Sequence, residues 1–106
     1  MLSPLLFEQA VNDNVRGSRP AWEAWLRYGS RENISDVMPQ IAVPVRVVSG
    51  ASDAVLPSCL LEKEVIARLS NAHLTQLPQV GHLSPLEAPE AVADIIQEEI
   101  KRFATP

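Results

Sequence analysis

Residues 43–57 read VPVRVVSGASDAVLP, and the fold class follows from this run. Val43 to Val48 is short, β-branched and apolar nearly throughout, which predicts a strand that ends near Ser49-Gly50. The lack of strict polar–apolar alternation is typical of a parallel strand covered on both faces. The loop after the strand contains one acidic residue, Asp53.

The residues that follow predict helices alternating with strands. We expect a helix at about 58–69, a strand at Ala72 to Leu77, and a final helix with Pro89 near its first turn. Glu87 and Glu90 are expected near the positive end of this last helix. The apolar positions of the first helix are Leu60, Leu61, Val65, Ile66 and Leu69. The positions of the last helix that are expected to face inward are Val92, Ile95, Ile96, Ile100 and Phe103. This order predicts an α/β fold, one right-handed βαβ unit with a closing helix.

Such a sheet is incomplete. Two-stranded sheets are marginal alone, and both edges expose unpaired backbone groups. No further strand is predicted among the 106 residues. The segment therefore looks like the end of a larger sheet.

Residues 1–40 predict short helices broken by turns. The clearest runs from Pro20 to Tyr28, with Ser18 as its cap and Gly29 in a left-handed position after its end. Its apolar face, spaced i, i+3 and i+4, comprises Trp22, Trp25 and Leu26. We expect both tryptophans to pack into a core or an interface, with contact to a substrate as the alternative.

Composition excludes several classes of function. Hydrophobic residues make up 46% of the chain, enough to bury one core. The net charge of −4 and the scattered basic residues argue against nucleic-acid binding. No apolar run reaches the roughly 18 residues of a membrane span, and the first residues lack the basic region of a signal peptide. We expect a cytoplasmic chain without nucleic-acid or membrane partners.

Cysteine and histidine usage argues against metal sites and disulfides. The single cysteine, Cys59, is expected to be a part-buried structural thiol in the first turn of a helix, with a nucleophilic role as the alternative. His73 begins the second strand, at the end of the sheet opposite the Asp53 loop, where a structural or solvated role is expected. The two histidines lack a partner carboxylate at ligand spacing, so we expect no metal and no cofactor.

Two loops follow the predicted strands at their carboxyl ends, where open α/β sheets place functional residues. The first contains Asp53, and the second, residues 78–85, contains His82. If the strands are parallel neighbours, both side chains project at one edge of the sheet. A carboxylate next to an imidazole fixes its tautomer and stabilises the imidazolium. Taken alone, a capping aspartate and a solvated histidine remain the alternative.

The residues around Asp53 and His82 resemble two segments of the α/β-hydrolase family. Residues 43–57 are similar to the acid-bearing segment, in which a strand led by Val-Pro runs into G-x-x-D and then a proline. Residues 80–90, VGHLSPLEAPE, are similar to the histidine segment, G-H followed by L-E-x-P-E. The resemblance covers residues 41–106, the C-terminal part of the core domain. Residues 1–40 resemble, less specifically, a remnant of the helical cap and its return to the core.

The resemblance implies that Asp53 is the triad acid and His82 the general base, with the nucleophile upstream. No G-x-S-x-G occurs in the 106 residues, and no oxyanion-hole loop is found. The serines considered, for which turn or cap roles are expected, are Ser18, Ser30, Ser52 and Ser58. We therefore expect a C-terminal fragment of a serine-type hydrolase, inactive alone, whose parent cleaves an ester, amide or similar bond in a small molecule.

Other readings stay open. The family also includes haloalkane and epoxide hydrolases, cofactor-free oxygenases and lyases. The chain is alternatively a noncatalytic binding or complementing subunit that self-associates or pairs its sheet edge with another protein, or a product without function. An adjacent upstream reading frame that encodes a G-x-S-x-G half would favour the enzyme.

Overall fold

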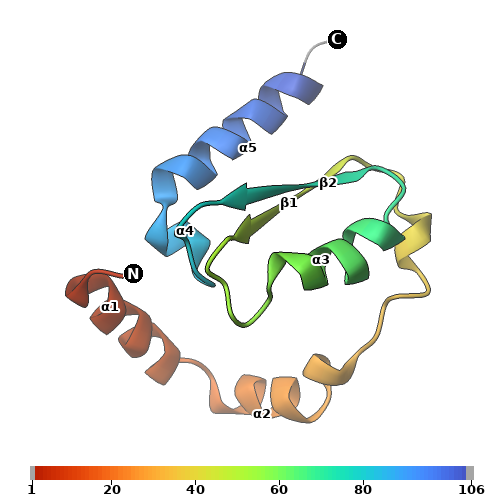
Figure 1. The fold of residues 1–106 in the computed structure, drawn as a ribbon. Coiled ribbons are helices and arrows are strands. Elements are labelled where there is room, and N and C mark those ends of the chain that lie inside the picture. The colour runs from red at the N-terminus through yellow and green to blue at the C-terminus, as the bar shows by residue number, and fades with distance from the viewer. Residues whose placement is uncertain (1, 105–106) are drawn as a thin grey trace.

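The computed structural model describes residues 2–104 and contains a two-stranded parallel sheet flanked by helices (Figure 1). Strand β1 (Val45–Gly50) pairs with β2 (Ala72–Leu77), residue by residue along their whole length. The second strand has the predicted bounds. The first begins two residues later than predicted, because Pro44 has no N–H to donate, whereas the Val45 amide donates to the carbonyl of Asn71 at 2.9 Å.

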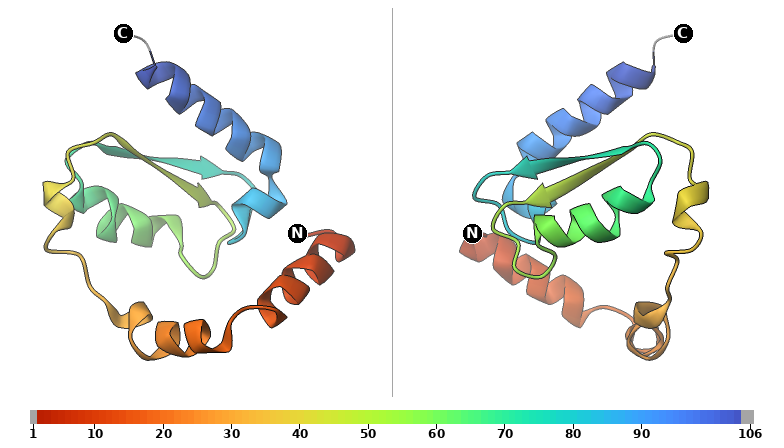
Figure 2. Two further views of the ribbon diagram at one scale, coloured as in Figure 1. Left: turned by 180° about the vertical axis from the view of Figure 1, so that it is seen from behind. Right: turned by 45° about the vertical axis from the view of Figure 1, so that its right-hand side comes forward.

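Helices cover both faces of this sheet. Helix α3 (Ser58–Glu64) lies on one face, and the short α4 (Ser84–Glu87) leads into α5 (Pro89–Phe103) on the other (Figures 1 and 2). The helix predicted at 58–69 is shorter than expected. It ends at Glu64, and a separate 3-10 turn, η3 (Ile66–Arg68), follows. Strands and helices thus alternate as predicted, in an α/β arrangement.

The buried core is small. Its buried apolar side chains are Leu77, Val80 and Ile95, and Val48, Ala88, Ala91 and Val92 are partly buried and pack against them. The expectation that Ile96, Ile100 and Phe103 face inward is wrong, since they are 54%, 60% and 52% exposed. A sheet of two strands is too narrow to cover the whole apolar stripe of α5.

Arg46 ties three elements together. Its Nε donates to Thr75 Oγ1 at 2.8 Å, across the sheet. Its Nη1 donates to Glu98 and Glu99 of α5 at 3.0 and 3.1 Å. The arginine therefore joins β1, β2 and α5 at the end of the sheet opposite Gly50.

The N-terminal part forms an arc of helices beside the sheet: α1 (Pro4–Val15), α2 (Arg19–Arg27), η1 (Gly29–Arg31) and η2 (Met38–Gln40) (Figure 1). Side-chain oxygens of Ser3 and Ser18 cap α1 and α2. The left-handed position predicted for Gly29 is wrong, because this glycine begins η1 and no described glycine has a positive φ.

Both tryptophans lie on α2 and remain substantially exposed. Trp22 and Trp25 are 44% and 55% exposed, and neither α1 nor α2 contains a buried residue. Their expected packing into a core is therefore not observed in this chain. With Leu26 at 61%, the three side chains of the apolar face of α2 are thus about half exposed. Within residues 2–104 as a whole, no helix is long and apolar enough to cross a membrane.

Candidate active site

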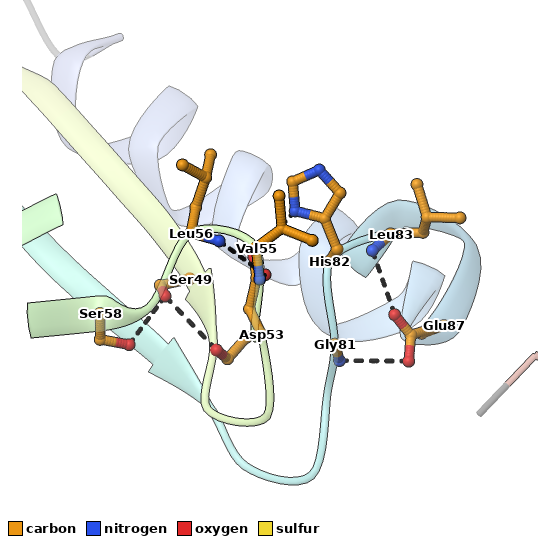
Figure 3. Close-up of polar contacts among 10 residues, drawn as sticks. Ser49, Asp53, Val55, Leu56, Ser58, Gly81, His82, Leu83 and Glu87 are labelled. Carbon is orange, nitrogen blue, oxygen red and sulfur yellow. Dashed lines mark hydrogen bonds and ion pairs between the residues drawn. The ribbon is translucent and has the colours of Figure 1, made fainter. Parts of the chain in front are cut away.

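The two loops of interest leave the same end of the sheet (Figure 3). Beyond the paired ends Gly50 and Leu77, the chain stays in contact through two backbone bonds. The amides of Ala51 and Ser52 donate to the carbonyls of Leu77 and Val80, both at 2.8 Å. The loops that contain Asp53 and His82 therefore run side by side.

Gly50 permits this close approach. A Cβ atom at this position would lie 2.3 Å from the carbonyl oxygens of both Val80 and Gly81. Any side chain would force the backbones apart, so only glycine fits here.

Asp53 is held by three contacts. Its Oδ1 accepts hydrogen bonds from the amides of Val55 and Leu56 at 2.8 and 2.9 Å. Its Oδ2 lies 3.0 Å from Nδ1 of His82. The Leu56 amide, followed by the hydrogen bond to His82, holds the pKa of Asp53 below its ordinary value. The carboxylate is thus ionised at neutral pH, and its side chain is only 8% exposed.

His82 presents its other ring nitrogen outward. The side chain is 45% exposed, and no hydrogen bond to Nε2 is observed within residues 2–104. An ionised carboxylate can only accept, so Nδ1 is the donor to Asp53, and in the neutral imidazole the lone pair is then on Nε2. The imidazole is therefore oriented to take a proton at Nε2. The proximity predicted for Asp53 and His82 is present, while their catalytic role remains a prediction.

Glu87 is part of the site, although the sequence placed it only near the positive end of the last helix. It ends α4, and its two carboxylate oxygens accept from the amides of Gly81 and Leu83, each at 3.1 Å (Figure 3). The Gly81 amide is the main cause that lowers the pKa of Glu87. The signal for this role in the sequence was the short separation of Glu87 from His82, five residues along the chain.

Ser58 bonds to side chains of both strands near the loop that contains Asp53. Its hydroxyl lies 2.8 Å from that of Ser49, which is only 2% exposed, and accepts from Gln76 Nε2 at 2.8 Å. The cap role expected for Ser58 is wrong, because Pro57 occupies the N-cap of α3 and no side-chain cap bond forms there. The network joins β1, β2 and α3 next to the loop.

A mostly apolar cavity of about 500 Å³ opens beside the histidine. Its walls come from the beginning of α1 and from the loop and helix after β2: Leu2, Pro4, Phe7, Gly81, His82, Leu83 and Glu87. The beginning of α1 therefore lies beside the loop that contains His82.

The remaining candidate residues lie elsewhere. Cys59 is exposed, so the part-buried thiol was wrongly expected. It lies one position beyond Ser58, off the face of α3 that contacts the sheet. His73 lies at the far end of the sheet, as predicted, with Nε2 4.0 Å from Glu99. Among the residues described, no cluster of His, Cys, Asp or Glu is suited to hold a metal.

Comparison with known proteins places the chain. No family model matches it. It is 37% identical over 75 residues to proteins of two Mycobacterium tuberculosis strains, CDC 1551 / Oshkosh and H37Rv, whose name, non-heme bromoperoxidase BpoC, is itself provisional. The match covers 71% of this chain and 28% of those proteins, so the chain spans little more than a quarter of their length.

Two solved structures resemble the fold. One is MGS-MChE2, an α/β hydrolase from a metagenome of Mar Chica lagoon sediments in Morocco, with a TM-score of 0.64 and 25% identity over 72% of this chain and 34% of that one. The other is a malate-bound thermophilic esterase from Thermogutta terrifontis, with a TM-score of 0.65 and 29% identity over 71% of this chain and 27% of that one. The chain belongs to the α/β-hydrolase fold family, of which it carries a C-terminal portion.

Proposed function

We propose that this chain supplies the acid, Asp53, and the general base, His82, of an α/β-hydrolase catalytic triad. The observation that carries the proposal is the 3.0 Å contact between Asp53 Oδ2 and His82 Nδ1 at the carboxyl edge of the sheet. This contact leaves Nε2 of His82 facing outward, beside the mostly apolar cavity. The esterase among the structural neighbours favours ester hydrolysis on a small molecule as the reaction.

The chemistry requires a nucleophile from outside these 106 residues. His82 Nε2 takes the proton of a hydroxyl nucleophile as its oxygen bonds to the ester carbonyl carbon. Asp53 stabilises the imidazolium, which then protonates the departing alcohol as the ester C–O bond breaks. Water, deprotonated by the same histidine, then bonds to the acyl carbon. The bond between that carbon and the oxygen of the nucleophile breaks, the imidazolium returns its proton to this oxygen, and the acid is released.

In this proposal the two parts of the chain have different tasks. Residues 41–106 form the C-terminal part of the core domain and position the two side chains. Residues 1–40 correspond to the cap and its return to the core. The support is that Leu2, Pro4 and Phe7 line the cavity beside His82.

A chimera tests the proposal. Residues 41–106 replace the corresponding segment of the Thermogutta terrifontis esterase, and hydrolysis of p-nitrophenyl acetate is measured. We expect a folded, active chimera in which Asp53→Asn and His82→Ala each lower kcat by about 10⁴-fold, as in other triads. Asp94→Asn, an equivalent change on α5, serves as the control.

A second candidate is a complementing subunit without chemistry of its own. The exposed apolar stripe of α5, with Ile96, Ile100 and Phe103, favours it. The chimera separates the two functions. A folded chimera whose activity is indifferent to His82→Ala excludes the catalytic role and leaves the complementing one.

A further inference from the structure

The backbone on both sides of His82 is bonded to a single side chain. Gly81 precedes the histidine and Leu83 follows it, and their amides donate to Oε1 and Oε2 of Glu87 (Figure 3). Both bonds measure 3.1 Å. Bonds to an ionised acceptor are about twice as strong as neutral ones. The Glu87 carboxylate therefore bonds to the backbone on both sides of His82, whose ring contacts Asp53.

Local structure is suited to this arrangement. The turn of α4 returns the chain onto the loop, because the Glu87 amide donates to the carbonyl of Leu83 at 2.9 Å while Leu83 donates to the Glu87 side chain. Glycine at position 81 makes room, since a Cβ there would lie 3.0 and 3.1 Å from the two carboxylate oxygens. The backbone bonds also lower the pKa of Glu87, so the acceptor is charged at neutral pH.

We propose that Glu87 is a positioning residue for His82, whose carboxylate holds the loop in the conformation that lets Nδ1 donate to Asp53. It acts through the histidine and takes no part in bond making or breaking. Without Glu87, the loop keeps the bond from Ser52 to the Val80 carbonyl, but neither amide next to His82 keeps its acceptor. The ring would then lose its fixed orientation. The inference deepens the proposed function and rests on it only for its catalytic consequence.

The first test measures the histidine rather than turnover. Long-range ¹H–¹⁵N spectra of the chain report the His82 tautomer and the exchange rate of its Nδ1 proton. In the unaltered chain we expect the Nδ1–H tautomer with a slowly exchanging proton. Glu87→Ala should mix the tautomers and speed exchange by about tenfold or more. Glu87→Gln keeps one acceptor oxygen and should fall between.

Matched controls separate positioning from general stability. Glu90→Gln makes the same charge change three residues later, in the first turn of α5, and should leave the His82 spectrum unaltered. Amide protection in Val45–Gly50 reports whether the sheet is intact. A protected sheet with an unaltered His82 signal in Glu87→Ala would overturn the proposal. So would loss of the sheet in both Glu87 variants, which would make the role purely structural.

The second test connects the inference to catalysis. In the chimera, Glu87→Ala should lower kcat by about 10²-fold, the cost of misplacing a catalytic group by about 1 Å, with KM little changed. If the spectra change as expected but His82→Ala leaves the chimera's activity intact, the proposed function fails and the positioning role stands. If His82→Ala abolishes activity and Glu87→Ala changes neither kcat nor the spectra, the positioning role fails alone.

Discussion

Gly50 is the residue at which the two site loops come closest, and it offers a direct probe of their coupling. In Gly50→Ala, the new methyl group would overlap the carbonyl oxygens of Val80 and Gly81. We expect a loss of about 1–3 kcal/mol in the free energy of unfolding, the usual cost of overpacking, together with loss of the Asp53–His82 bond. Urea unfolding and the His82 spectrum measure the two effects. Gly17→Ala is the control, because its Cβ would chiefly meet the side chain of Trp22.

Asp53 predicts how stability depends on pH. Its pKa is lower in the folded chain than the ordinary 3.8, first because of the Leu56 amide and then because of His82. A lowered pKa stabilises the folded state above the ordinary value, and this contribution disappears as the pH falls from about 3.8 through the folded pKa. Asp53→Asn should therefore unfold with a shallower acid dependence in this window. Urea titrations at a series of pH values test this, and equal slopes for both proteins would contradict it.

At the scale of elements, Arg46 links the sheet to α5. Its side chain is 18% exposed and bonds to Thr75, Glu98 and Glu99. Arg46→Met keeps most of the apolar length and removes every one of these bonds. We expect faster amide hydrogen exchange throughout α5 and little change in α3. Arg19→Met, which breaks an exposed pair with Glu23 within α2, is the control and should leave α5 protection as it was.

The same scale shows what could be predicted from the sequence. β2 has its predicted bounds, and β1 differs by two residues, because runs of β-branched residues next to turn residues are strong local signals. The proximity of Asp53 and His82 was predicted from parallel pairing of the strands together with the motifs around the two residues. The hydrogen bonds from the Gly81 and Leu83 amides to Glu87 could not be predicted, since they depend on the turn of α4, which has no apolar periodicity. Exposure of Cys59 and Trp25 depends on which surfaces meet in three dimensions, which local patterns do not specify.

For the whole molecule, exposed apolar surface predicts association. Ile96, Ile100 and Phe103 form one stripe along α5, and each large apolar side chain left exposed forgoes about 1.5–3 kcal/mol. We expect the isolated chain to self-associate and to bind ANS. Changing Ile96 and Ile100 to lysine should reduce both effects without loss of helix content. Sedimentation and ANS fluorescence measure this, and a monomer with low ANS binding would refute it.

The isolated chain should also lack esterase activity. Within these 106 residues, the Asp53–His82 pair has no G-x-S-x-G serine to activate. We expect turnover of p-nitrophenyl acetate no faster than that of the His82→Ala variant. Activity that copurifies with the chain and is abolished by a serine-directed inhibitor would contradict this expectation.

The register of the two strands has a consequence for the chemistry. A slip of one residue between β1 and β2 would move His82 by about 3.3 Å relative to Asp53 and turn β2 over. A hydrogen bond of 3.0 Å cannot survive such a slip. The bond from Arg46 to Thr75 joins the two strands in the observed register, in which Arg46 pairs with His73 and Thr75 with Val48. Arg46 therefore helps to hold the strand register on which the Asp53–His82 hydrogen bond depends, although it contacts neither residue.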